Sequence, residues 1–124
     1  MILFDTNIFI EILRNNLRIC EIVDTINRSD VALSDIVRIE LFYGSFNKAE
    51  LKEIEKGLAD LHILPVQPQI SEIAVDLVKQ YCLSHKLNLP DAYIAATALY
   101  HDIELFTLNL KDFSYISNLK FYQL

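Results

Sequence analysis

The chain has 124 residues, 52% of them hydrophobic, and a formal net charge of −6. These values predict a single domain over residues 1–124 with a sizeable core. They exclude a membrane span, since no uncharged apolar run reaches about 18 residues, and the N-terminus lacks the basic leader of a signal peptide. The two cysteines, Cys20 and Cys82, lie in helical patterns without metal-binding spacing, which indicates reduced thiols of a cytoplasmic protein.

Short apolar runs alternate with amphipathic patterns from the first residue onward. Residues 1–5 form an apolar run without alternation, typical of a strand buried on both faces, and this run ends at Asp5. The other predicted elements are helices at 7–14 and 16–28, a strand at 31–33, helices at 36–45 and 48–60, a strand at 62–64, a helix over 70–81, a helix opening at Pro90–Asp91, a strand at 104–107 and a short strand at 120–122. This alternation predicts an α/β fold with a central, mostly parallel sheet of about four or five short strands.

Acidic and polar side chains stand where a parallel sheet brings distant segments together. Asp5 ends the first strand, and open parallel sheets bind their ligands beyond the carboxyl ends of the strands. Glu40 interrupts an otherwise apolar helix face, where a carboxylate is costly unless it is paired or bound to a metal. Asp91 opens a helix rich in alanine, and Asn109 and Asp112 follow a predicted strand.

Each of these residues also has a purely structural interpretation. Glu40 can lie at the edge of its apolar face and reach water, or pair with Arg38 or Arg14. Asp91 can serve only as a helix N-cap, which is a favoured position for aspartate. The two polar residues near the end of the chain can make a turn and start a short helix.

Taken together, the acids favour a metal site over these separate explanations. Three or four carboxylates within a few ångströms of one another repel, and a divalent cation removes that conflict. A ligand set made only of oxygen favours Mg²⁺ or Mn²⁺ over zinc. The three histidines show no convergent spacing, so they are not expected to be ligands.

Four segments carry a resemblance to a known family. They are residues 2–7 (ILFDTN), 40–44 (ELFYG), 89–98 (LPDAYIAATA) and 106–113 (FTLNLKDF). In this order the chain resembles PIN-domain ribonucleases over nearly its whole length, and most closely the VapC-type toxins of toxin–antitoxin pairs. The resemblance implies a PIN-like three-layer α/β/α fold and metal-dependent hydrolysis of RNA phosphodiester bonds, with inhibition of translation and growth as the outcome.

The resemblance also implies roles for individual residues. Asp5, Glu40 and Asp91 correspond to the acids that bind Mg²⁺ or Mn²⁺ in the family. Many members carry a fourth acid where this chain has Asn109, and either this asparagine or Asp112 takes that role. Three further side chains correspond to residues that orient substrate or water, and these are Thr6, Asn7 and Thr107.

The expected partners follow from the same family. VapC-type toxins are bound by a small VapB-like antitoxin whose extended tail covers the active site, and they commonly form homodimers. The expected partners of this chain are therefore an RNA substrate, a small antitoxin and a second copy of itself.

A row of cations offers one place for RNA. Lys48, Lys52 and Lys56 recur every four residues on one helix, and Arg14 adds a further candidate contact. The commoner use of such a row is pairing with neighbouring glutamates, here Glu50, Glu53 and Glu55, and this interpretation is favoured.

Two other functions share features with the nuclease. A phosphorylated receiver domain is also an α/β domain that binds Mg²⁺, but Asp5 is followed by Thr6 and Asn7 instead of by a second acid, and no lysine ends the strand at Thr107. A PIN-fold protein without catalysis, acting only as an interaction module, is the stronger rival because Asn109 departs from the family pattern.

Overall fold

Four short parallel strands form the centre of the structure, a computed structural model that describes residues 1–123. The strands are β1 (Ile2–Phe4), β2 (Val31–Ser34), β3 (His62–Leu64) and β4 (Glu104–Phe106), in the order β3-β2-β1-β4. All neighbouring pairs run parallel, so the carboxyl ends of the four strands share one edge of the sheet. The segments that follow β1 and β4 therefore lie next to each other.

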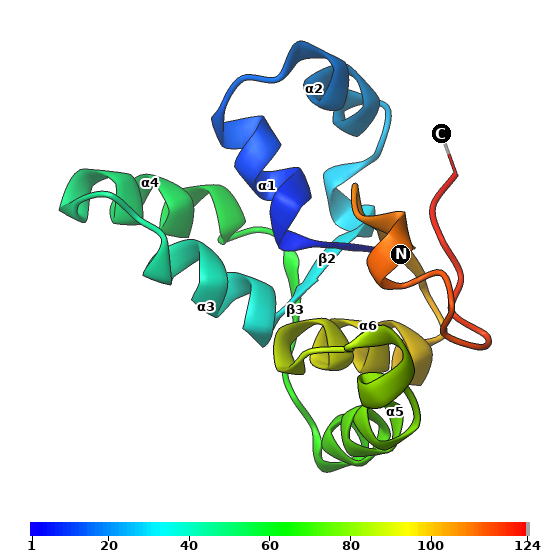
Figure 1. The fold of residues 1–124 in the computed structure, drawn as a ribbon. Helices are drawn as coiled ribbons and strands as arrows, with labels where there is room; N and C mark the ends of the chain where they lie inside the picture. The colour runs from blue at the N-terminus through cyan, green and yellow to red at the C-terminus, as the bar shows by residue number, and fades with distance from the viewer. Residues whose placement is uncertain (124) are drawn as a thin grey trace.

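Six α-helices surround this sheet. They are α1 (Thr6–Leu13), α2 (Leu17–Asp24), α3 (Asp35–Tyr43), α4 (Lys48–Leu58), α5 (Pro68–His85) and α6 (Leu89–His101), joined by the 3₁₀ turns η1 (Arg28–Asp30) and η2 (Leu110–Asp112). Figure 1 shows α1 and α2 on one side of the sheet and α5 and α6 on the other, while α3 and α4 form a helical hairpin that projects sideways. The predicted three-layer α/β/α fold with a parallel sheet is confirmed.

Polar residues begin most of these helices by accepting a hydrogen bond from the first turn. The side chains of Asn16, Ser34, Asn47 and Asn88 each accept from a backbone N–H two or three residues inside the helix. Asp5 stands at the same position before α1 and accepts from the N–H of Thr6. The chain therefore turns from β1 directly into α1.

The core lies between the sheet and its helices. Phe4 of β1 and Phe106 of β4 are fully buried and meet edge to face, with ring centroids 5.3 Å apart. Helix α6 buries nearly all of its circumference, because its small side chains let it lie closely between α5 and the sheet; the buried residues are Ala92, Ile94, Ala95, Ala96, Thr97 and Ala98.

Several predicted boundaries differ from those of the structure. The helix expected at 16–28 ends at Asp24, and the segment after it forms η1 instead. The strand expected at 120–122 is reduced to a single parallel bridge between Phe121 and Leu105. In the part of the chain that the structure describes, none of the helices has the length and hydropathy needed to cross a membrane.

Candidate active site

Asp5 lies at the carboxyl edge of the sheet, between β1 and α1. Its side chain is only 5% exposed, and its backbone N–H still donates to the carbonyl of Phe106, which extends the pairing with β4 by one residue. One carboxylate oxygen accepts from the N–H of Thr6 at 2.7 Å, and the other accepts from the hydroxyl of Thr107 at 2.8 Å. The orientation of Asp5 is therefore set by groups from two distant parts of the chain.

Asn7 joins the start of α1 to the loop after β4. Its amide nitrogen lies 3.3 Å from Asp5 Oδ2 and 3.4 Å from Thr107 Oγ1, and its amide oxygen accepts from the N–H of Leu108. Thr107 Oγ1 also accepts from the N–H of Asn109. The Asn7 and Thr107 side chains thus hold Asp5 and the loop together and point their donors at the carboxylate.

Thr6 connects Asp5 to Glu40. The hydroxyl of Thr6 donates to Glu40 Oε1 at 2.7 Å, while its backbone N–H donates to Asp5. The sequence suggested that the Thr6 and Thr107 hydroxyls would orient a ligand, water or phosphate. In the structure both hydroxyls donate to carboxylates, so they orient the acids.

Glu40 is exposed, as in the alternative in which it reaches water, and the apolar residues around it do not form a buried face. Ile39 and Tyr43, which share that side of α3, are 61% and 92% exposed, and the buried residues of the helix are Val37 and Leu41. The hairpin of α3 and α4 projects from the sheet, which leaves this side of α3 open to solvent (Figure 1). The position of Glu40 is therefore explained by its contact with Thr6.

The two alternative cation partners of Glu40 pair with other acids. Arg38 Nη2 lies 2.7 Å from Asp35 Oδ1, and Arg14 Nη1 lies 3.5 Å from Glu11 Oε1. No ion pair of Glu40 is found within residues 1–123. Neither carboxylate oxygen of Glu40 therefore meets a cation of the described chain, and Oε1 accepts only from the Thr6 hydroxyl.

Asp91 lies in the first turn of α6, so the alternative interpretation in which it caps this helix is wrong. The N-cap is Asn88, whose side chain accepts from the N–H of Asp91 at 3.0 Å, and the helix begins at Leu89. Capping therefore does not explain an aspartate here, and Asn88 is the one neighbour whose side chain lowers the pKa of the Asp91 carboxyl.

The charges of four acids converge at this edge of the sheet. Burial, and then the charges of Asp5, Asp112 and Glu40, raise the pKa of Asp91 to about 6. Burial is also the main cause that raises the pKa of Asp5, and the charges of Glu40 and Asp112 raise it further. The hydrogen bonds from Thr107 and Thr6 lower the same pKa but do not cancel the rise. The four carboxyl groups thus form one electrostatic cluster.

Asp112 belongs to this cluster by its charge, whereas Asn109 does not. Asp112 is the last residue of η2, not the first residue of a short helix as the sequence suggested, and its charge acts on both Asp5 and Asp91. Asn109 precedes η2 with an exposed side chain that forms no cap.

Comparison with known proteins identifies the family. The PIN-domain family model matches residues 2–119. The chain is 33% identical to Ribonuclease VapC10 and 30% identical to Ribonuclease VapC19, both of Mycobacterium tuberculosis; each alignment covers 97% of this chain, and 91% and 98% of the two relatives. The chain belongs to the PIN-domain family. A toxin–antitoxin complex from Klebsiella pneumoniae superposes with a TM-score of 0.83 at 30% identity over the full length of both chains.

The acids of this PIN domain suit a hard divalent cation. All four are carboxylates, and burial together with the charges of the other three acids holds the pKa of Asp91 well above its ordinary value. As the side chains lie, no three acidic, histidine or cysteine residues among positions 1–123 stand close enough to hold an ion. Carboxylates that repel one another are expected to separate in the absence of a counter-charge.

The lysines that the sequence singled out lie along one side of α4 on this PIN domain. Lys48, Lys52 and Lys56 are exposed, and none of them makes the expected ion pair with a glutamate of α4 in the described residues, so that prediction is wrong. Arg14 lies nearest the acids, because it lines the same surface cavity as Glu40.

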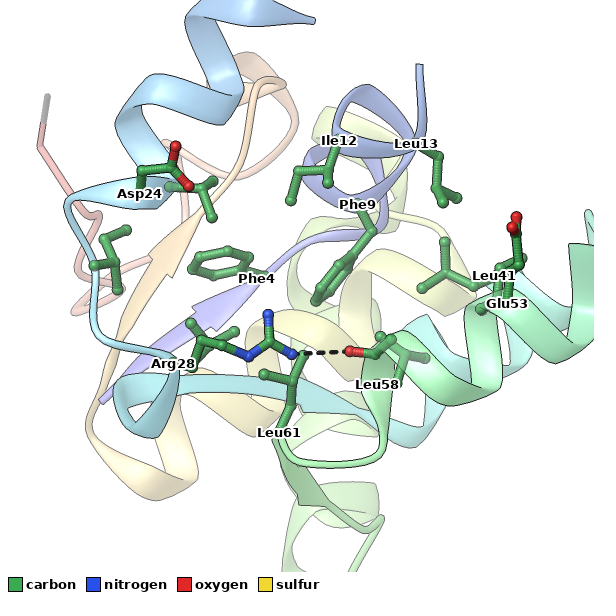
Figure 2. A pocket seen from close by; sticks show the side chains of 15 residues that line it. Phe4, Phe9, Ile12, Leu13, Asp24, Arg28, Leu41, Glu53, Leu58 and Leu61 are labelled. Atoms are coloured by element: carbon green, nitrogen blue, oxygen red, sulfur yellow. Dashed lines mark hydrogen bonds between the residues drawn. The ribbon is translucent and has the colours of Figure 1, made fainter. Parts of the chain in front are cut away.

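An apolar groove of about 360 Å³ opens between α1, α2 and α4 of the PIN domain. Figure 2 shows Phe4 and Phe9 at its centre, with Ile12 and Leu13 on one side, and the hydrogen bond from Arg28 to the carbonyl of Gly57 at its other side. A second cavity of about 320 Å³ shares three lining residues with this groove and reaches Glu40 and Arg14; the shared residues are Leu13, Leu41 and Ile54. An apolar surface thus leads from the groove to the acidic cluster.

Proposed function

We propose that this protein is a metal-dependent endoribonuclease and the toxin of a toxin–antitoxin pair. The observation that carries the proposal is the electrostatic cluster of Asp5, Glu40, Asp91 and Asp112 at the carboxyl edge of the sheet. Full-length similarity to Ribonuclease VapC10 and to a chain of a toxin–antitoxin complex of known structure supports it. In a cell, cleavage of RNA by this protein would inhibit translation and growth. We place the protein in the cytoplasm, where RNA is available.

The residues have distinct roles in this proposal. Asp5 and Asp91 hold Mg²⁺ or Mn²⁺, and Thr6 orients Glu40 to bind the ion directly or through a water molecule. Asp112, not Asn109, supplies the fourth acid, because its charge acts on Asp5 and Asp91. When bound, the ion supplies a Lewis acid and lowers the pKa of a coordinated water. The hydrogen bonds from Thr107 and Asn7 keep the Asp5 carboxylate in place during the reaction.

We also propose two protein partners. The groove between α1, α2 and α4 fits an apolar segment of a small antitoxin. The end of such a segment can lie in the second cavity, which Glu40 lines, and a basic side chain there would pair with the acid. A homodimer is supported by exposed apolar side chains at the end of the α3 hairpin, namely Ile39, Tyr43 and Phe46. Sedimentation that finds only monomers at cellular concentrations would contradict the dimer.

Substitution of Leu13 by lysine is expected to weaken antitoxin binding at least about tenfold, because a charge would enter an apolar contact. Leu13 is 49% exposed and lines both cavities, so the folded chain tolerates the change. The measurement is the affinity for the product of the adjacent reading frame. Leu17→Lys is the matched control, since Leu17 is 76% exposed and lines neither cavity; equal binding by both variants would place the antitoxin elsewhere.

Cleavage of RNA by the purified protein tests the enzymatic part of the proposal. Single-stranded RNA is expected to be cut in the presence of Mg²⁺ or Mn²⁺ and to stay intact when a chelator is added. Binding of the antitoxin without any cleavage would instead favour the non-catalytic interaction module. Cleavage that persists in chelator would contradict a role for the metal.

A further inference from the structure

Three aromatic side chains form a small cluster where α5 ends, a short turn before Asp91 in the first turn of α6. Tyr81 and His85 come from the last turns of α5, and Tyr115 comes from the segment after η2. The His85 and Tyr115 rings stack with centroids 4.0 Å apart and an angle of 13° between their planes. Tyr81 meets Tyr115 edge to face at 5.0 Å, so the Tyr115 ring is held between two neighbours.

Ser117 fixes the segment that carries Tyr115. The Tyr81 hydroxyl lies 3.5 Å from Ser117 Oγ and accepts from the Ser117 N–H at 3.4 Å, and Tyr81 is only 9% exposed. The Tyr115 hydroxyl, in contrast, makes no hydrogen bond with any residue among positions 1–123. The neighbouring rings therefore hold the Tyr115 ring in place, while its hydroxyl has no hydrogen-bond partner among the described residues.

This hydroxyl lies within the electrostatic field of the acidic cluster. Burial raises the pKa of Tyr115, and the charges of Asp91 and Asp112 raise it further. The phenol therefore keeps its proton at neutral pH. It is a neutral hydrogen-bond donor whose surroundings include the charges of Asp91 and Asp112.

Few protein donors are free to meet an anionic substrate here. Carboxylates can only accept hydrogen bonds, and the hydroxyls of Thr6 and Thr107 already donate to Glu40 and Asp5. Arg14 is near the acids only on the Glu40 side, where it lines the second cavity. On the Asp91 side, Tyr115 offers a donor that has no other partner within the described residues.

We propose that Tyr115 positions the RNA by donating its phenolic hydrogen to a non-bridging oxygen of a phosphate bound beside Asp91 and Asp112. The stack on His85 fixes the position of the Tyr115 ring. The hydroxyl of that ring then contacts the phosphate group. This role rests on the proposed ribonuclease function, because it concerns the substrate of the same site.

Tyr115→Phe tests the proposal because it removes the hydroxyl and keeps the ring. The cleavage rate of a single-stranded RNA at a mapped site is expected to fall about tenfold to a hundredfold, the range for loss of a hydrogen bond to a charged group. The melting temperature and the affinity for Mn²⁺ are expected to stay at wild-type values. Tyr100→Phe is the matched control, since Tyr100 lies at the far end of α6 from Asp91 and should leave the rate unchanged.

A phosphorothioate substrate separates contact with the phosphate from a general structural effect. Sulfur in place of the contacted oxygen should slow the wild-type enzyme for one diastereomer, and it should slow Tyr115→Phe much less, because the donor is already gone. Wild-type cleavage by Tyr115→Phe would overturn the proposal, as would equal sulfur effects in both proteins. A loss in His85→Ala without one in Tyr115→Phe would also overturn it, in favour of base stacking. A wild-type protein that cleaves no RNA would overturn the proposed function itself, and this inference with it.

Discussion

Asp5→Asn is expected to lower RNA cleavage by at least about a hundredfold, because the charge stabilisation that depends on this carboxylate amounts to several kcal/mol. Asp5 is the most buried acid of the cluster and receives hydrogen bonds on both oxygens. An asparagine has nearly the same shape and can still accept from the N–H of Thr6. The variant is therefore expected to fold and to lose the negative charge.

The comparison must exclude a contaminating nuclease and a loss of structure. Asp76→Asn, on the exposed side of α5, is the matched control and is expected to cleave like the wild type. Far-ultraviolet circular dichroism and melting curves report whether the Asp5 variant is folded. If a folded Asp5→Asn protein retains more than about a tenth of the wild-type rate, catalysis does not depend on this carboxylate.

Asp91→Asn is expected to raise the stability of the metal-free protein at neutral pH. The folded-state pKa of Asp91 is raised to about 6 from an ordinary value of 3.8, so ionisation in the folded state opposes folding. The native protein then binds more protons than the unfolded chain between about pH 4 and pH 6, and its stability falls as the pH rises through this window. The full penalty is present above pH 6.

The expected size of this effect is about 2 kcal/mol, reduced from about 3 because Asp91 is partly exposed. That corresponds to a melting temperature about 6 °C higher for the variant than for the wild type in chelator at pH 7.5. The wild type should also lose stability between pH 4 and pH 6, while the variant should change much less. These values come from melting curves recorded at several pH values.

Excess Mg²⁺ should reverse the order of the two proteins. The ion binds only to the folded cluster, so it stabilises the wild type by mass action and stabilises Asp91→Asn less. Asp35→Asn is a suitable control, because Asp35 pairs with Arg38 outside the cluster. A variant that melts below the wild type in chelator would show that Asp91 is not repelled by its neighbours.

The arrangement of the sheet could be predicted because its signals are local. The apolar run before Asp5 and the short runs that became β2, β3 and β4 were recognisable without their partners. Parallel strands share one edge, so an acid at the end of β1 was expected to lie near the residues after β4. The hydrogen bond between Thr107 and Asp5, across 102 positions of sequence, agrees with that expectation.

The surroundings of Glu40 could not be predicted, because exposure depends on how whole helices are placed. Apolar residues around Glu40 suggested a buried face, but the projecting hairpin leaves Ile39 and Tyr43 in solvent. The cap of α6 was misassigned for a different reason, since Asn88 and Asp91 both suit a helix start and only the three-dimensional course of the chain chooses between them.

Tyr115 gave no signal in the sequence. Its relation to the site depends on three contacts between α5 and the end of the chain, and it is separated from Tyr81 by 34 positions. A lone tyrosine between Ser114 and Ile116 is unremarkable in sequence, and its importance follows from its free hydroxyl and from the charges of Asp91 and Asp112 that act on it. Long-range packing of this kind lies beyond pattern-based prediction.

The most direct test of the shared metal site is a crystal of the protein soaked in Mn²⁺ and measured for anomalous scattering. One or two strong peaks are expected within coordination distance of Asp5 and Asp91, with Glu40 or its bound water beside them, and the peaks should vanish in Asp5→Asn. A Mn²⁺-saturated crystal with no peak at these carboxylates, or with Asp5 and Asp91 bound to separate ions far apart, would contradict a shared cation and the ribonuclease mechanism based on it.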